Sequence, residues 1–309
     1  MAILVLTHPL PNDPFVSALK AAAPHVPVWT EDDLPDPNAV EVIVAWRMRA
    51  GFLPRFPNLR VLCCPFAGVD KLLGLPDLPA HVPITRIVDP MQAVEIAQYV
   101  VANALHHTRD LDRYAEQQTA AHWARHPVRK PAQCRVGILG LGEVGQAVAR
   151  AFLPLGYPVA GWSRSGRDVP GVTSHRGASA LPQLLAQSDI LVCTLPLTPE
   201  TRGLLNRDML AQLPPGAFLI NVGRGEHLVE ADLKALLDSG ALSGAALDVF
   251  EREPPQADNW VWHHPKVVAT PHIAAQASYE LVATQCLDAL QRARDGLDQP
   301  FAIDPARGY

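Results

Sequence analysis

The sequence contains 309 residues, of which 48% are hydrophobic and 18% are charged, and its formal net charge is −5. This composition is typical of a globular protein, and the length favours two domains over one. The negative charge argues against a nucleic-acid or anionic-membrane surface, and no apolar run reaches the roughly 18 residues of a membrane-spanning helix.

Short apolar runs alternate with helical patterns, which predicts an α/β fold with parallel sheets. In the N-terminal part, strands are expected near 2–6, 41–46, 60–64 and 84–88. One long helix is then predicted over 92–118. From Arg135 onward the strands read RVGILG, PVAGW, DILVCTLP, AFLINV, SGAALDV and KVVAT, and helices are expected over 143–153, 180–187, 229–239 and 276–295. The pattern indicates two α/β units with the long helix where they join.

The strand RVGILG leads directly into a glycine-rich turn where a helix begins, with the residues Gly140, Leu141, Gly142, Glu143, Val144 and Gly145. In such a turn the first glycine allows a tight bend, the second lets a pyrophosphate approach the backbone, and the third allows close packing of helix and strand. The phosphate would lie at the helix N-terminus. The pattern alone is weak, because an ordinary turn also uses glycine, but its strand–turn–helix context predicts a dinucleotide site.

The stretch AGWSRSGR at 160–167 follows the next strand, where an NAD-binding protein usually carries an acidic residue. Ser163, Arg164, Ser165 and Arg167 stand there instead. A carboxylate would accept a hydrogen bond from the ribose 2′-hydroxyl and repel a 2′-phosphate, whereas hydroxyl and guanidinium groups donate to a phosphate. We therefore predict NADPH as the cofactor, with NADH a weaker possibility; the alternative is a solvated loop with no such role.

Polar residues that could bind an acid and protonate a carbonyl oxygen during its reduction follow later strands. Arg224 comes after AFLINV, Asp248, Glu251 and Glu253 come at and after the end of SGAALDV, and His272 comes after KVVAT. Because the carboxyl ends of parallel strands meet at one edge of a sheet, these groups are expected to face one crevice. An arginine fork binds a carboxylate, and a histidine supported by an acidic residue can protonate a carbonyl oxygen.

These motifs resemble the D-isomer-specific 2-hydroxyacid dehydrogenases, most closely the bacterial glyoxylate/hydroxypyruvate reductase A subgroup. The resemblance covers nearly the whole chain and includes GLGEVG, TLPLTPETRGLLN, NVGRGEHLVEADLKALLDSG, ALDVFEREP and HPKVVATPHIAA. It implies that Arg224 holds the substrate carboxylate, that His272 is the acid/base and that Glu253 is its partner. Glu251 and Asp248 are second choices for the partner, and Asp248 is expected nearer the nicotinamide.

The resemblance also implies contacts elsewhere. Further cofactor contacts are expected from Leu195, Pro196, Thr201, Val222 and Gly223. The loop CCPFAGVD would bind the substrate carboxylate through the backbone amides of Ala67 and Gly68, and Trp46 would narrow the substrate pocket or simply pack in the core. A flavodoxin-like substrate domain is expected over 1–97 and 276–309, and a Rossmann-type NAD(P)-binding domain over 98–275. A homodimer is expected, and Trp123 lies in the loop that forms a dimer arm in relatives, where it would reach the pocket of the neighbouring subunit or serve simply as an interface aromatic.

The function predicted from this reading is the NADPH-preferring reduction of small 2-keto acids, glyoxylate and hydroxypyruvate, to D-2-hydroxy acids. The segment DPMQAVE at 89–95 departs from the subgroup, so the preferred substrate side chain stays open. The alternatives are a reductase of bulkier 2-keto acids such as phenylpyruvate and a dinucleotide-sensing binding protein. No metal is predicted, although His122 and His126 are spaced as on a metal-binding helix. The five cysteines form no C-x-x-C pair, so we expect reduced thiols in a cytoplasmic protein.

Overall fold

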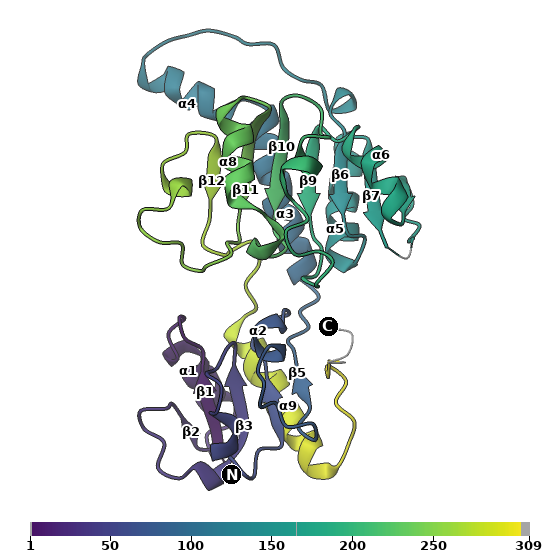
Figure 1. Cartoon of the computed structure of the whole chain (residues 1–309). Coiled ribbons are helices and arrows are strands. Elements are labelled where there is room, and N and C mark those ends of the chain that lie inside the picture. The colour runs from purple at the N-terminus through teal and green to yellow at the C-terminus, as the bar shows by residue number, and fades with distance from the viewer. Residues whose placement is uncertain (1, 165, 304–309) are drawn as a thin grey trace. The chain divides into compact units, whose positions relative to one another are not determined.

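The computed structural model describes residues 2–164 and 166–303. It divides into two compact units, the first comprising Met1–Pro90 with Gln276–Tyr309 and the second comprising Met91–Ala275 (Figure 1). The sequence-based boundary after residue 97 lies later than this division. The reason is that helix α3 (Gln92–Thr108) belongs with the second unit, where residues along its length pack against helix α5 (Glu143–Phe152).

The first unit contains a parallel sheet with the strand order β2-β1-β3-β4-β5. Its strands are β1 (Ala2–Leu6), β2 (Val28–Trp29), β3 (Val40–Ala45), β4 (Val61–Cys63) and β5 (Ile84–Thr85). The strands are almost wholly apolar because helices and loops cover both faces. Helices α1 (Asp13–Ala22) and α9 (Tyr279–Asp295) pack on the face of Ile3 and Val5, and the segment around α2 (Asp70–Leu73) packs on the opposite face with Leu4.

The second unit contains a parallel sheet with the order β12-β11-β10-β9-β6-β7-β8. Its strands are β6 (Val136–Leu139), β7 (Val159–Ser163), β8 (Val172–Arg176), β9 (Ile190–Cys193), β10 (Ala217–Asn221), β11 (Leu242–Leu247) and β12 (Val267–Ala269). Helices α3 and α5 cover one face, and α6 (Leu181–Leu185), α7 (Arg207–Leu210) and α8 (Glu230–Asp238) cover the other. The order reverses between β6 and β9, which is where a Rossmann-type sheet binds its ligand. The predicted fold class, two doubly wound parallel-sheet domains, is confirmed.

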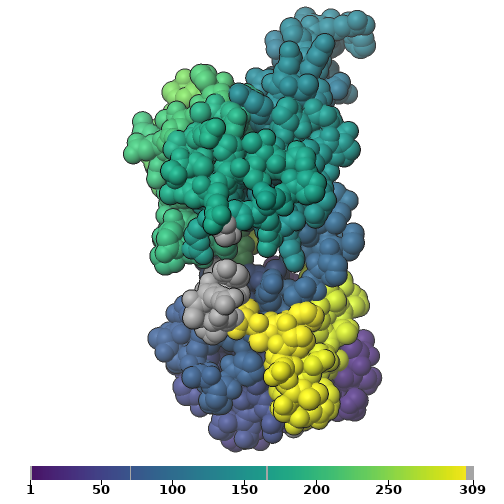
Figure 2. All heavy atoms as spheres, turned by 90° about the vertical axis from the view of Figure 1, so that its right-hand side faces the viewer, coloured from purple at the N-terminus to yellow at the C-terminus, as the bar shows by residue number. Residues whose placement is uncertain are grey.

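Two features of the elements differ from the sequence-based expectation. The long helix predicted over 92–118 is two helices, α3 and α4 (Leu111–Thr119), because Asp110 adopts a left-handed conformation with φ 50° that an α-helix cannot contain. Strand β8 was not predicted, since its sequence VTSHR lies at the sheet edge and lacks an apolar run. Helix α4 and the segment after it stand out from the second unit, and Trp123 there is 92% exposed (Figure 2).

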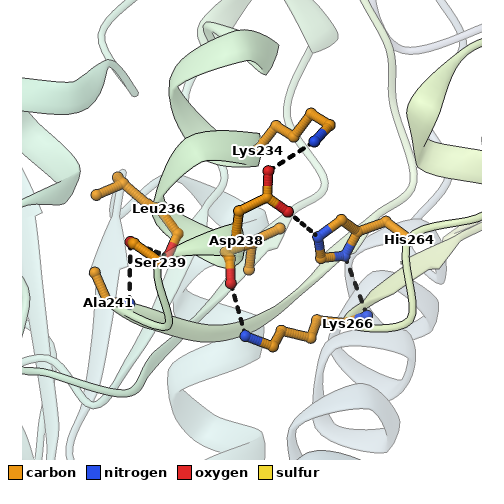
Figure 3. A network of polar contacts seen from close by, with 8 residues as sticks. Lys234, Leu236, Asp238, Ser239, Ala241, His264 and Lys266 are labelled. Atoms are coloured by element: carbon orange, nitrogen blue, oxygen red, sulfur yellow. Dashed lines mark hydrogen bonds and ion pairs between the residues drawn. The ribbon is translucent and has the colours of Figure 1, made fainter.

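A polar network fixes strand β12 to the end of helix α8 (Figure 3). Lys266 Nζ donates to the Leu237 carbonyl at 2.6 Å, and His264 Nε2 lies 3.3 Å from Asp238 Oδ1. Lys234 Nζ donates to the other oxygen of Asp238 at 2.6 Å. A lysine at the carboxyl end of a helix is stabilised by the unpaired carbonyl groups there. The network thereby anchors the strand that leads to His272.

Candidate active site

The glycine-rich turn connects β6 to α5, and the steric surroundings differ at each of its three glycines. Gly140 has φ 98°, a conformation that L side chains rarely adopt. At Gly145 an added Cβ would lie 1.9 Å from the Gly140 carbonyl oxygen, so only glycine lets the helix approach the strand this closely. At Gly142 an added Cβ would meet nothing within 4 Å, so the space in front of the helix N-terminus is open. This combination suits a diphosphate lying against backbone amides.

The loop after β9 lies against this turn at the reversal point of the sheet. Thr194 Oγ1 donates to the Gly140 carbonyl at 2.9 Å and so joins the two loops. Leu195 is buried, and the Pro196 carbonyl accepts a hydrogen bond from Thr201 Oγ1 at 2.8 Å. Thr194 thus joins the start of this loop to the glycine-rich turn, and the Thr201 hydroxyl holds Pro196 within the loop.

The loop after β7 carries hydroxyl and guanidinium groups, which can donate hydrogen bonds to an anion. Ser163 Oγ is buried and has no hydrogen-bond partner among the residues that the structure describes, which is costly unless a ligand satisfies it. Arg164 is exposed, and Arg167 Nη1 donates to the Leu141 carbonyl of the glycine-rich turn at 3.4 Å. Ser165, also predicted here, lies outside the described residues. A buried hydroxyl with guanidinium groups beside it fits the 2′-phosphate of NADPH.

Arg176 lies against this loop, although no sequence pattern identified it. It ends strand β8 and pairs with Ser163 of β7. A Cβ added at Gly166 would lie 2.6 Å from Arg176 Cδ, so the arginine side chain lies directly over the loop. The sequence spacing could identify Arg164 and Arg167, but Arg176 is brought there by an edge strand that the pattern did not reveal.

His272 and Glu253 form a hydrogen-bonded pair. Nδ1 of His272 lies 3.0 Å from Glu253 Oε2, and Glu253 Oε1 accepts from the Phe250 amide at 3.0 Å. The glutamate side chain is 22% exposed and the histidine 40%. Burial alone would raise the pKa of Glu253, but the hydrogen bonds and charge of His272, with smaller contributions from the Phe250 amide and Arg224, lower the pKa below its ordinary value. Glu253 is thus a carboxylate at neutral pH, while Glu251 is exposed to solvent.

The turn that carries His272 is held by Asp248. His272 has φ 57°, which is unfavourable for a residue with a side chain. Asp248 is 1% exposed and accepts hydrogen bonds from the Ile273 and Ala274 amides, each at 2.8 Å, and from Thr270 Oγ1 at 2.6 Å. The two carboxylate oxygens therefore bind the Thr270 hydroxyl before His272 and two backbone amides after it, a role that the sequence pattern did not reveal.

Tyr99 of α3 extends this chain of hydrogen bonds. Its hydroxyl lies 2.7 Å from Thr270 Oγ1. Burial is the main cause that raises the pKa of Tyr99 to about 12, so the phenol keeps its proton at neutral pH. Because the single hydroxyl proton of Thr270 is directed to Asp248, the Tyr99 hydroxyl donates to Thr270.

Arg224 begins the tight turn of residues 224–227 that follows β10 (the arginine turn). The side chain of Asn221 joins the end of the strand to this turn, because its amide donates to the Arg224 carbonyl at 3.0 Å and its carbonyl oxygen accepts from the Gly223 amide at 3.2 Å. A Cβ added at Gly225 would lie 1.8 Å from the carbonyl carbon of Phe250. The backbone of the arginine turn thus packs directly on the loop that carries Glu253, which brings Arg224 to the same sheet edge as the His272–Glu253 pair.

The predicted substrate residues of the first unit gather at the ends of β3 and β4. Trp46 packs edge-on against Phe66, with the ring centroids 5.3 Å apart. Ala67 and Gly68 follow, and the Gly68 carbonyl accepts from Cys64 Sγ at 3.3 Å. Trp46 is half-buried and packs against the hydrophobic core of this unit, so its role at a substrate pocket stays a prediction.

Two further properties of the described residues bear on function. They contain no group of three or more histidine, cysteine or acidic side chains placed to hold a metal ion. Within the same residues, no helix combines the length and the apolar character needed to cross a membrane.

A Rossmann-type sheet with a glycine-rich turn at its reversal point, and with arginine, glutamate and histidine at neighbouring strand ends, is the arrangement of a nicotinamide-dependent oxidoreductase. Residues 101–274 match the family model described as D-isomer specific 2-hydroxyacid dehydrogenase, NAD binding domain. The chain is 36% identical to the glyoxylate/hydroxypyruvate reductase A of Salmonella enteritidis PT4, over 99% of both chains. It belongs to the D-isomer-specific 2-hydroxyacid dehydrogenase family, and it is an NAD(P)H-dependent oxidoreductase acting on CH–OH groups.

Solved structures agree with this assignment. A D-isomer-specific 2-hydroxyacid dehydrogenase from Xanthobacter autotrophicus Py2, in complex with NADPH and MES, is 39% identical with a TM-score of 0.89, covering 100% of this chain and 99% of that one. The NADPH-dependent glyoxylate/hydroxypyruvate reductase of Sinorhizobium meliloti, in complex with NADP and sulfate, is 34% identical with a TM-score of 0.91 and the same coverage.

Proposed function

We propose that the protein is an NADPH-preferring reductase that converts small 2-keto acids, glyoxylate and hydroxypyruvate foremost, into D-2-hydroxy acids. The observation that carries this proposal is the His272–Glu253 pair, 3.0 Å apart, at the sheet edge where Arg224 also emerges. The similarity to the glyoxylate/hydroxypyruvate reductase of Salmonella supports the choice of substrates.

Some of the proposed cofactor residues would bind the phosphates of NADPH, and the others would line the rest of the cofactor site. The N-terminus of α5 would hold the diphosphate, and Ser163, Arg164 and Arg167 would hold the 2′-phosphate. The other proposed contacts are Leu195, Pro196, Thr201, Val222, Gly223 and Asp248. Bound NADPH supplies the hydride that reduces the keto carbon. The complexes of the Xanthobacter and Sinorhizobium proteins with NADPH and NADP support this choice of cofactor.

The protein's own groups would bind the acid and deliver the proton. The Arg224 guanidinium binds the substrate carboxylate. Nδ1 of His272 donates to Glu253, so Nε2 is the nitrogen that gives its proton to the carbonyl oxygen. The Glu253 carboxylate stabilises the charged ring before that transfer. Trp46 limits the size of the substrate side chain.

Steady-state kinetics test the proposal directly. With NADPH, glyoxylate and hydroxypyruvate are expected to give higher kcat/KM than pyruvate or phenylpyruvate, followed as loss of the reduced-nicotinamide absorbance. NADH in parallel is expected to be the poorer cofactor. Faster reduction of phenylpyruvate would instead indicate a reductase of bulkier 2-keto acids. Tight cofactor binding without turnover of any acid would support a dinucleotide-sensing protein.

Replacing Arg164 and Arg167 together by serine tests the 2′-phosphate contacts. The double variant is expected to lose roughly 10²–10⁴-fold in kcat/KM for NADPH, because each of the two charge-assisted hydrogen bonds contributes about 1.5–3 kcal/mol. Activity with NADH should stay close to the wild-type value, because that cofactor lacks the phosphate. Arg150→Ser at the far end of α5 is the matched control. Equal losses with both cofactors would show that the loop does not distinguish them.

A further inference from the structure

His227 is a buried histidine within the arginine turn, and the proposed reaction gives it no chemical role. It ends the short 3-10 helix Gly225–His227 that follows Arg224, and its side chain is 0% exposed. A polar ring in such a position is costly unless both of its nitrogens find hydrogen-bond partners.

Both ring nitrogens of His227 have backbone partners. Nδ1 accepts a hydrogen bond from the Arg224 amide at 3.0 Å, and Nε2 lies 3.2 Å from the Pro196 carbonyl oxygen. Because a carbonyl oxygen only accepts, Nε2 carries the proton and Nδ1 is the acceptor. Cys193 Sγ also lies 3.8 Å from Nδ1. Burial is the main cause that lowers the pKa of His227, which keeps the ring in the neutral form that this geometry requires.

The ring therefore joins two loops that leave neighbouring strands. The Arg224 amide belongs to the turn after β10, and the Pro196 carbonyl belongs to the loop after β9. A Cβ added at Gly223 would lie 3.0 Å from ring atoms of His227, so the ring also packs tightly against the residue before the arginine. Its bond to the first residue of the turn resembles the contact by which a side chain caps the start of a helix.

We propose that His227 is a positioning residue for substrate binding, which fixes the backbone of Arg224 so that the guanidinium meets the substrate carboxylate in a single orientation. The same ring sets the distance from the arginine turn to the loop of Pro196. This inference rests on the proposed role of Arg224 in binding the substrate. The residue touches neither the substrate nor the reacting atoms and acts through Arg224.

The first test compares His227→Leu with His227→Gln in the full-length protein. Leucine removes the acceptor for the Arg224 amide and the donor for Pro196, and KM for glyoxylate is expected to rise about tenfold. Glutamine offers one oxygen acceptor and an amide donor, so it is expected to restore KM to within about threefold of the wild-type value. If glutamine and leucine give the same KM, the hydrogen bonds of the ring do not position Arg224 and the proposal is overturned. Should His227→Leu fail to fold, His227→Met, which also lacks an acceptor for the Arg224 amide and a donor for Pro196, replaces it in the same comparison.

A double-mutant cycle separates positioning from general structural support. In an Arg224→Ala background, His227→Leu is expected to change kcat/KM by less than about twofold, because the group it positions is gone. If the two losses multiply instead, His227 does not act through Arg224. Arg224→Ala alone also separates the two hypotheses. An unchanged KM for glyoxylate in Arg224→Ala would contradict the proposed function. A large increase of KM in Arg224→Ala, together with an unchanged KM in His227→Leu, would contradict only the inference about His227.

Discussion

Replacement of His272 by alanine is expected to lower kcat for keto-acid reduction by roughly 10²–10⁴-fold, the usual contribution of a positioned general acid. The carbonyl oxygen would then have to take its proton from water. The dissociation constant for NADPH, measured by quenching of tryptophan fluorescence, should stay within about twofold, because the phosphate contacts lie in other loops of the unit. Such a result would place the loss in the chemical step.

Two variants complete the His272 experiment. Glu253→Gln keeps a hydrogen-bond acceptor for His272 Nδ1 but removes the charge, so its loss of kcat should be smaller than that of His272→Ala. His263→Ala is the matched control, because His263 is exposed at a loop before β12 and should leave kcat unchanged. A His272→Ala protein that keeps more than about a tenth of the wild-type kcat would contradict the assignment of the proton donor.

Site residues could be predicted from the sequence where a chemically suitable residue directly follows a buried strand. The turn at Gly140, the arginine after AFLINV and the histidine after KVVAT each follow a buried apolar strand. Parallel strands bring such ends to one edge whatever the loops do. Glu253 was selected over Glu251 through the family resemblance, and Glu253 is the one whose carboxylate contacts His272.

The remaining residues depend on loop geometry, which no periodic pattern encodes. Asp248 was expected near the nicotinamide, and that role stays a prediction. The structure adds that its oxygens accept from the Ile273 and Ala274 amides, in the turn where His272 adopts φ 57°. No sequence pattern distinguished His227, whose ring bonds to two loops that follow different strands. Arg176 lies against the loop after β7 because it ends a polar edge strand, which has no apolar run to reveal it.

Replacement of Asp248 by asparagine is expected to lower both stability and kcat, although the two side chains are nearly identical in shape. The carboxylate accepts hydrogen bonds from Thr270 Oγ1, the Ile273 amide and the Ala274 amide. Asparagine has one oxygen acceptor, so its NH₂ group would face at least one of these donors in a buried position. Leaving a buried donor unpaired, with the loss of a hydrogen bond to a charged group, costs roughly 2–4 kcal/mol. In a protein of this size that corresponds to a melting temperature lower by roughly 5–15 °C.

The effect on kcat should follow the loosening of the turn, and graded variants can show it. Tyr99→Phe removes the outermost hydrogen bond of the chain, Thr270→Val removes the hydroxyl that reaches Asp248, and Asp248→Asn disrupts the backbone contacts themselves. We expect kcat to fall in that order, because only the last change releases the residues on either side of His272 from a conformation that is unfavourable in itself. The exposed Asp258→Asn is the matched control for the change of charge. If Asp248→Asn lowers the melting temperature but leaves kcat unchanged, the carboxylate supports the fold alone and His272 keeps its position by other contacts.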